Sequence, residues 1–302
     1  MFYKKCILIY LLSWFLKVYI PYKIKEHFHI SYIDFNFLNK LYKELRRRGD
    51  KCMIRYMKNI VIAIIIGIMG INCTVICINA EASERRIVYL TFDDGPSFSN
   101  TDSILDILCK NDVKATFCIV GSNAVSNKGT MRRINESGMG ILPHCNNHDY
   151  KKIYNSTESY ARDLDDCMKT INSIIDEERT YTMVRMPGGS TNTVCSRDVL
   201  RNIKSYLKSR DVNYIDWTID CGDTKRSVVE RNVIKDNIEE VCGKNVIEVV
   251  LMHDLENKKT TTEALEDIIN DYKNLGYEFK TVEAMEPWEF DYLLSRKVIN
   301  RD

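Results

Sequence analysis

The chain has 302 residues, of which 45% are hydrophobic and 28% are charged. This composition excludes an intrinsically disordered protein and is sufficient for one large domain with an additional segment. The net charge of +1 is unevenly divided, because residues 1–82 contain 13 Lys/Arg against 5 Asp/Glu, whereas residues 83–302 contain 30 against 37. The acidic second part lacks the basic surface typical of nucleic-acid-binding domains, so we expect no nucleic-acid partner.

The first feature along the chain is an uncharged, apolar stretch at residues 59–78. Its length of about 20 residues is what a helix needs to span a bilayer. Basic residues precede it, and the positive-inside rule therefore leaves residues 1–58 in the cytoplasm. We expect residues 59–79 to form a transmembrane or signal-anchor helix and residues 83–302 to fold outside the cell membrane. Ala80 and Ala82 resemble a signal-peptidase site, so secretion after cleavage at Ala82 is the alternative.

Two points about the N-terminal part stay open. Met53 and Met57 would each start a conventional signal segment, which suggests that residues 1–52 are an upstream extension of the reading frame. A shorter apolar run at residues 6–20, interrupted by Lys17, fits a second span, an interfacial helix or no element at all.

Short β-branched or aromatic runs alternate with longer amphipathic runs from residue 86 onward, which predicts an α/β fold with a parallel sheet. Seven such strands fit either a closed barrel or an open doubly wound sheet. The polar motifs described next follow the strands, which favours the barrel. The expected strands are 87–91, 115–120, 140–143, 181–185, 212–217, 246–252 and 277–282, and the expected helices are 101–110, 130–137, 157–177, 197–209, 228–241 and 261–275.

Seven cysteines lie beyond residue 83, an odd number without any Cys-x-x-Cys pair. A disulfide scaffold or a zinc knuckle is therefore not expected. We predict that most of these cysteines are small buried hydrophobic residues.

Two adjacent carboxylates, Asp93 and Asp94, end the first predicted strand and precede the turn at Gly95-Pro96. Neighbouring side chains at a strand end point in different directions, so one carboxylate can act as a base while the other binds a metal. A plain surface turn favours the same residue types and is the alternative.

His144 and His148 lie four residues apart, directly after the third predicted strand. Together with Asp94 they form a set of two histidines and one carboxylate, which leaves room for water as an open catalytic metal site requires. Such a site activates water as a nucleophile near neutral pH. Two unconnected surface histidines are the alternative.

Three further polar segments follow predicted strands. Arg185 precedes a Pro-Gly-Gly turn whose backbone amides can approach a substrate oxygen, although an ordinary turn with a surface ion pair fits too. The segment from Trp217 to Asp223 follows the next strand. His253 ends the strand after that and can act as a general acid, or can be a structural histidine bonded to a carbonyl.

Residues 86–282 resemble the polysaccharide deacetylases, which form carbohydrate-esterase family 4 and are also called the NodB-homology domain. The resemblance rests on five motifs in order: Thr91-Phe92-Asp93-Asp94-Gly95-Pro96, His144 with His148, Arg185 to Gly189, Asp223, and Leu251-Met252-His253. It implies a distorted (β/α)7 barrel, a divalent metal that is usually Zn²⁺, with Co²⁺, Mn²⁺ or Ni²⁺ as alternatives, and hydrolysis of N-acetyl groups on glycans.

The resemblance also implies a role for each matching residue. Asp94, His144 and His148 would bind the metal, and Asp93 would be the general base, oriented and kept ionised by Arg185. His253 would be the acid that protonates the leaving amine, tuned by Asp223. The remaining positions would bind the oxyanion or the substrate: Gly188, Leu251 and Trp217.

Three positions depart from the family pattern. Cys145 stands where Ser or Thr is usual, Gly188 where an aromatic residue is common, and Thr224 where Trp is common beside the fourth motif. Because the catalytic set is intact, we expect activity on a substrate of altered shape.

The expected substrate is N-acetylglucosamine in extracellular peptidoglycan, with chitin oligomers next. An O-acetyl esterase acting on xylan would use the same metal chemistry. The non-enzyme alternative is a glycan-binding domain with a vestigial site. The expected partners are therefore a glycan and, through the N-terminal helix, the membrane. The oligomeric state is left open.

Overall fold

Strand β1 (Arg86–Asp93) is the first element of the computed structural model, which describes residues 85–302. Every residue of β1 after Arg86 is buried. A continuous run of β-branched and aromatic residues is typical of a central parallel strand, which is covered on both faces. Residues 85–302 form one compact unit around this strand.

A six-stranded parallel sheet has the order β3-β2-β1-β7-β6, and β8 pairs with β1 as well. Strands β4 and β5 form a second, two-stranded sheet. The Arg185 amide links the two sheets by donating to the Pro143 carbonyl at 3.1 Å. The strands are β2 (Thr116–Val120), β3 (Gly140–Cys145), β4 (Met183–Val184), β5 (Asn213–Tyr214), β6 (Ile219–Asp220), β7 (Ile247–His253) and β8 (Tyr277–Phe279).

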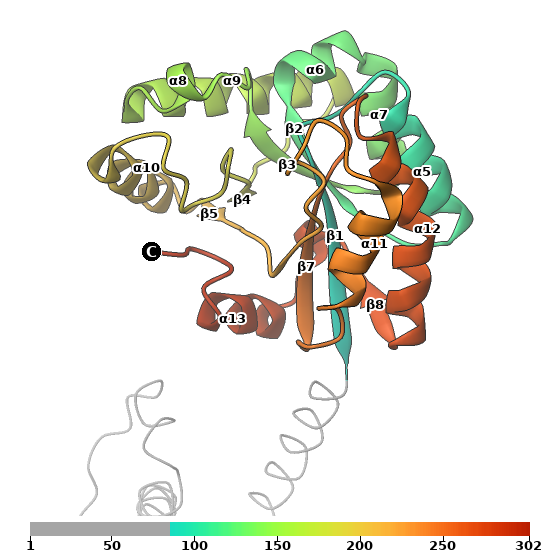
Figure 1. The fold of residues 1–302 in the computed structure, drawn as a ribbon. Coiled ribbons are helices and arrows are strands. Elements are labelled where there is room, and N and C mark those ends of the chain that lie inside the picture. The colour runs from blue at the N-terminus through green and yellow to red at the C-terminus, as the bar shows by residue number, and fades with distance from the viewer. Residues whose placement is uncertain (1–84) are drawn as a thin grey trace, which may run out of the picture. The chain divides into compact units, whose positions relative to one another are not determined.

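Helices surround the strands, with α5, α11 and α12 on one side of β1 and β7 and with α13 on the other (Figure 1). The helices are α5 (Asn100–Lys110), α6 (Gly121–Ser126), α7 (Lys128–Glu136), α8 (Tyr150–Ile153), α9 (Thr157–Ile175), α10 (Arg197–Ser209), α11 (Arg231–Glu239), α12 (Lys259–Asn274) and α13 (Pro287–Ser295), and the 3₁₀ turn η1 (Val282–Ala284) precedes α13.

The two faces of β1 contribute to different parts of the core. Val88, Leu90 and Phe92 pack with the helices that cover one face. Ile87 and Tyr89 pack into a second cluster that includes residues of α13. Because side chains alternate along a strand, Thr91 and Asp93 continue this second face toward the carboxyl end.

The predicted strand at 212–217 was wrong in its extent. Residues 85–302 contain eight strands rather than seven, because this segment forms only β5 and is followed by a separate strand, β6. Between them the chain turns to the C-terminal segment: Ile215 pairs with Ile299, and the Asp216 amide donates to the Val298 carbonyl at 2.8 Å. The segment 298–300 therefore lies against the chain between β5 and β6, which do not pair with each other within residues 85–302.

The other strands and the main helices lie where the sequence predicted them, with shifted ends. Strand β3 extends to Cys145 and includes His144, whereas β4 and β8 are shorter than expected. Helices α6, α8 and α13 were not predicted. Of the seven cysteines, four are buried as predicted, and all seven are free: Cys109, Cys118, Cys145, Cys167, Cys195, Cys221 and Cys242.

The predicted membrane helix at 59–79 and the segments before it lie outside the described residues and stay predictions. No helix within residues 85–302 is both long and apolar enough to cross a membrane.

Candidate active site

Asp93 and Arg185 form a buried ion pair at the carboxyl end of β1. The Arg185 side chain is 0% exposed, and its Nη1 lies 3.2 Å from both carboxylate oxygens of Asp93. Its Nη2 donates to Thr91 Oγ1 at 3.2 Å. Burial lowers the pKa of Arg185, but the charge and hydrogen bond of Asp93, together with the charges of other neighbours such as Asp216, outweigh this effect and raise the pKa overall. The guanidinium is thus held as a cation directly against the carboxylate.

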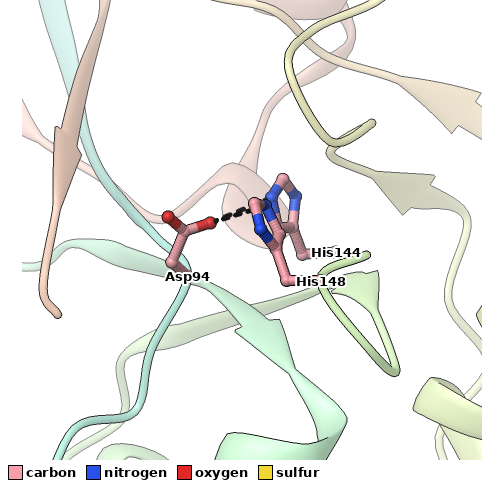
Figure 2. A group of neighbouring side chains, drawn as sticks. All are labelled: Asp94, His144 and His148. Atoms are coloured by element: carbon pink, nitrogen blue, oxygen red, sulfur yellow. Dashed lines mark ion pairs between the residues drawn. The ribbon is translucent and has the colours of Figure 1, made fainter. Parts of the chain in front are cut away.

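Asp94, His144 and His148 converge on one point beside this pair (Figure 2). Asp94 Oδ1 lies 3.4 Å from His144 Nε2 and 3.1 Å from His148 Nε2. Zinc ligands at about 2.0–2.2 Å in a tetrahedral site are about 3.4 Å from one another. The two distances from Asp94 fit such a site, and all three donor atoms lie within 4.8 Å of one another, so the group can hold a divalent cation with one position left open.

His144 owes its direction to an irregularity in β3. The β2–β3 register pairs Ile119 with Pro143 and Val120 with Cys145, so His144 is an extra residue in a bulge. Bulges re-aim side chains at strand ends. His144 Nδ1 lies 2.8 Å from the Arg185 carbonyl, which can only accept a hydrogen bond. The proton is therefore on Nδ1, and Nε2 presents its lone pair to the metal position.

Asp94 and His148 come from the turns that follow their strands. Asp94 has a φ of 80°, outside the range that most side chains adopt, and its carbonyl accepts from Asn123 Nδ2 at 2.8 Å. Backbone strain of this kind is concentrated at functional sites. Burial raises the pKa of Asp94, but the neighbouring rings of His144 and His148 together outweigh this and hold it well below its ordinary value. Asp94 is therefore an anion, the form that binds a cation.

His253 and Asp223 form a second buried pair. His253 Nδ1 lies 2.8 Å from Asp223 Oδ1, and Asp223 Oδ2 accepts from the His253 amide and from Thr261 Oγ1, both at 2.9 Å. Burial lowers the pKa of His253, but the hydrogen bond and charge of Asp223 raise it to about 9. His253 is therefore protonated near neutral pH and can donate a proton through Nε2.

The register of β1 and β7 brings the two pairs together. Asp93 is the direct partner of His253 in this parallel ladder, so the two side chains leave the sheet on the same face. Leu251, on the same strand face as His253, is 5% exposed. All four residues predicted as catalytic are thus placed around one strand end: Asp93, Arg185, Asp223 and His253.

The glycines after β4 adopt the left-handed conformations expected of a tight turn, with φ of 72° at Gly188 and 79° at Gly189. A Cβ atom on Gly189 would lie 2.9 Å from the Trp217 ring, so the indole packs on the turn itself. A Cβ atom on Gly188 would lie 3.4 Å from both Asn192 and the Tyr150 hydroxyl. The missing side chain at Gly188 therefore leaves a narrow space between Tyr150 and Asn192.

Asp254 is a supporting residue that the sequence did not reveal. It is 0% exposed, its Oδ2 accepts from Thr101 Oγ1 at 2.6 Å, and its Oδ1 has no partner within residues 85–302. Its amide donates to the Asp93 carbonyl at 3.3 Å. Burial raises the pKa of Asp254 to about 7. The carboxyl group lies against Gly95, so it supports the turn that carries Asp93 and Asp94.

We expect Gly95→Ala to destabilise the fold by about 1–3 kcal/mol, as overpacking of a filled core does. The added Cβ would lie 2.0 Å from Asp254 Oδ2, and the buried carboxyl group would have to give up its bond to Thr101. The free energy of unfolding in urea, at fixed metal concentration, measures this effect. Gly129→Ala is the matched control, since a Cβ there meets nothing within 4 Å. Equal stability of the two variants would contradict the close packing at Gly95.

Comparison with known proteins agrees with this site. The polysaccharide deacetylase family model matches residues 80–206. A peptidoglycan-N-acetylglucosamine deacetylase of Listeria monocytogenes, PgdA, is 30% identical over 209 residues, and the match covers 68% of this chain but only 40% of the relative. A peptidoglycan-N-acetylglucosamine deacetylase of Bacillus cereus is 30% identical over 203 residues, covering 66% of this chain and 70% of the relative.

A solved structure is similar over the same region. The catalytic domain of a peptidoglycan N-acetylglucosamine deacetylase from Eubacterium rectale has a TM-score of 0.61 and 29% identity, covering 67% of this chain and 90% of that one. The chain therefore belongs to the polysaccharide deacetylase family, which confirms the resemblance found in the sequence.

Proposed function

We propose that this chain is a metal-dependent deacetylase that removes acetyl groups from N-acetylglucosamine in peptidoglycan. The observation that carries the proposal is the position of Asp93, a carboxylate held by Arg185, directly beside the group of Asp94, His144 and His148. Base and metal ligands in one place suit hydrolysis of an amide. Two of the family members compared above are named for this activity on peptidoglycan.

Asp94, His144 and His148 would hold the metal, for which we propose Zn²⁺ ahead of Co²⁺, Mn²⁺ or Ni²⁺. When bound, a divalent cation supplies Lewis-acid activation of water and of the acetyl carbonyl. Asp93 then accepts the proton of the attacking water, while Arg185 fixes the orientation of the Asp93 carboxylate. The Gly188 amide would donate to the carbonyl oxygen as negative charge develops there.

His253 protonates the nitrogen of the leaving sugar amine. It is cationic near neutral pH, and Asp223 keeps its Nδ1 occupied so that Nε2 carries the proton that is transferred. Leu251 and Trp217 would form apolar contacts with the sugar or the acetyl methyl group. Asp93 and His253 lie on adjacent strands, and the reacting amide would bind between them.

Acetate release by the purified full chain tests the proposal. Three substrates separate the candidate functions: peptidoglycan, N-acetylated chitin oligomers and O-acetylated xylan. We expect the highest kcat/KM on peptidoglycan, loss of activity on chelation and recovery when Zn²⁺ is added back. Preference for xylan would replace the proposal with an O-acetyl esterase. A protein that binds the glycan but shows no metal-dependent acetate release would be a binding domain with a vestigial site.

We further propose that residues 83–302 act outside the cell membrane, either anchored through 59–79 or secreted after cleavage at Ala82. The support is the uncharged stretch with its basic flank and the extracellular location of the proposed substrate. N-terminal sequencing of the native protein from membrane and culture fractions distinguishes anchoring from cleavage. A mature N-terminus upstream of residue 53 would contradict the hypothesis that 1–52 are an upstream extension.

We expect a bell-shaped pH profile of kcat/KM, because the base must be ionised while the acid is protonated. His253 loses its proton as pH rises through about 9, which sets the alkaline limb. Asp223→Asn removes the charge that raises the pKa of His253, so the alkaline limb should move to lower pH and the acid limb should move less. An unmoved alkaline limb, or one still present in a partly active His253→Ala variant, would remove His253 from the mechanism.

A further inference from the structure

A large groove lies away from the catalytic strand ends, along helix α10. It has a volume of about 820 Å³ and runs between α10, β5 and the C-terminal segment near Asn300. Four basic residues of α10 line it: Arg197, Arg201, Lys204 and Lys208. Their spacing of four, three and four residues places them on one face of the helix, opposite the buried Ile203 and Leu207.

The basic groups of this face are largely available to a ligand. Arg197 and Lys208 are exposed and have no ion-pair partner within residues 85–302. Arg201 pairs with Asp198, but both side chains are more than 70% exposed, so water screens the pair. Lys204 is half-buried, donates to the Arg301 carbonyl and lies 5.6 Å from the Tyr214 ring centre.

The acidic groups in the groove do not cancel this charge. Asp211 and Asp302 line it and Asp198 pairs with Arg201, so three acidic side chains face the four basic ones. Residues 83–302 as a whole are acidic, with 30 Lys/Arg against 37 Asp/Glu. The positively charged face of α10 therefore differs from the rest of this part of the chain. Such a face attracts anions.

The groove adjoins a second cavity that extends toward the turn at Gly188. This second cavity of about 520 Å³ shares Arg197 and Lys204 with the groove and extends along the loop from Ser190 to Ser196, which joins β4 to α10 in Figure 1. Asn192 in this loop flanks Gly188, and Tyr150 on the other side of Gly188 lies 4.9 Å from the ring of His148. A path of contacts thus leads from a metal ligand to the basic face.

We propose that the basic face of α10 binds peptide carboxylates carried by the same glycan strand whose acetyl group occupies the active site. The proposal rests on the proposed function and deepens it, because it makes the substrate an anionic, peptide-bearing strand rather than a neutral one. Peptidoglycan carries short peptides with free carboxylates at regular intervals, whereas chitin carries none. Arginine binds a carboxylate through two parallel hydrogen bonds, as it does a phosphate, so the regular spacing of the peptides along the strand is what makes their carboxylates the proposed ligand.

The test removes three exposed charges together, in the variant Arg197→Gln/Arg201→Gln/Lys208→Gln of the full chain. The substrates are soluble peptidoglycan strands with their peptides and the same strands after enzymatic removal of the peptides. We expect the kcat/KM of the variant on peptide-bearing strands to fall about 10-fold, which is the effect of losing three solvent-screened ion pairs. The loss should come from a higher KM, with kcat unchanged. On peptide-free strands it should match the wild-type chain. The difference should shrink as salt rises from 50 to 200 mM.

A control variant removes the same charge elsewhere: Lys128→Gln/Lys169→Gln/Lys244→Gln, at three exposed positions. This variant should behave as wild type on both substrates. An equal loss in the control, or an equal loss on peptide-free strands, would overturn the proposal, since either result would mean a general charge effect or damage to the site.

A binding measurement keeps this inference separate from the proposed function. If the wild-type chain released no acetate from any strand, the proposed function would fail, while co-sedimentation with insoluble peptidoglycan would still test the groove. We expect the α10 variant to bind less than the control variant to peptidoglycan stripped of phosphate polymers. Equal binding there, or a loss seen only when the phosphate polymers are present, would contradict recognition of peptide carboxylates.

Discussion

Asp93→Asn is expected to lower kcat by about 10²–10⁴ while the protein keeps its metal. Asparagine has nearly the same shape and can still accept from Arg185, which lies 3.2 Å from both oxygens of Asp93. It cannot take a proton from water. Metal content, measured on the same preparation as acetate release, separates loss of the base from loss of the metal.

Two controls sharpen this result. Asp198→Asn removes a carboxylate that is 81% exposed on α10 and should leave kcat unchanged. Thermal unfolding of the Asp93→Asn protein identifies any fraction that fails to fold beside the buried Arg185. Full turnover by a folded, metal-loaded Asp93→Asn chain would show that Asp93 and Asp94 have been assigned the wrong roles.

Asp94→Ala and His148→Ala should each lose metal and activity together. Within residues 85–302 only three candidate ligands converge on the site, so no spare donor there compensates for the loss of one. Metal content after gel filtration, determined by mass spectrometry, is the direct measurement. Asn147→Ala is the matched control, because this exposed neighbour contributes its backbone amide to Asp163. One metal per chain in either ligand variant would rule out the proposed site.

The main components of the candidate site could be predicted because each is a chemically distinctive residue at the end of an apolar strand. Asp93, His144, Arg185 and His253 all follow this pattern, and parallel strands bring their carboxyl ends together. Asp254 could not be identified this way. Its supporting role depends on burial against Gly95 and on a hydrogen bond from Thr101, a residue 153 positions away in the sequence. Contacts between residues so far apart cannot be recognised from the sequence pattern around Asp254.

The elements of the fold could also be predicted where a local sequence pattern is sufficient to define them. Long apolar or amphipathic runs such as β1 and α9 determine their own type, whereas β4 and β5 have only two residues each and depend on tertiary pairing. Helix α8 spans a single turn, too short for periodicity to appear. Helix α13 did carry a usable signal, since Pro287 opens it and Glu286 and Glu289 form a capping box.

The three candidate metal ligands come from segments of different kinds, and this links the choice of ion to the choice of substrate. Asp94 directly follows β1, and His144 belongs to β3 and is bonded to the Arg185 carbonyl, whereas His148 lies in the turn before α8. An ion of larger radius would therefore move His148, which lies outside the strands, before it moved Asp94 or His144. The His148 ring lies against Tyr150, whose hydroxyl borders the space at Gly188. Ionic radius would thus alter the width of the space at Gly188.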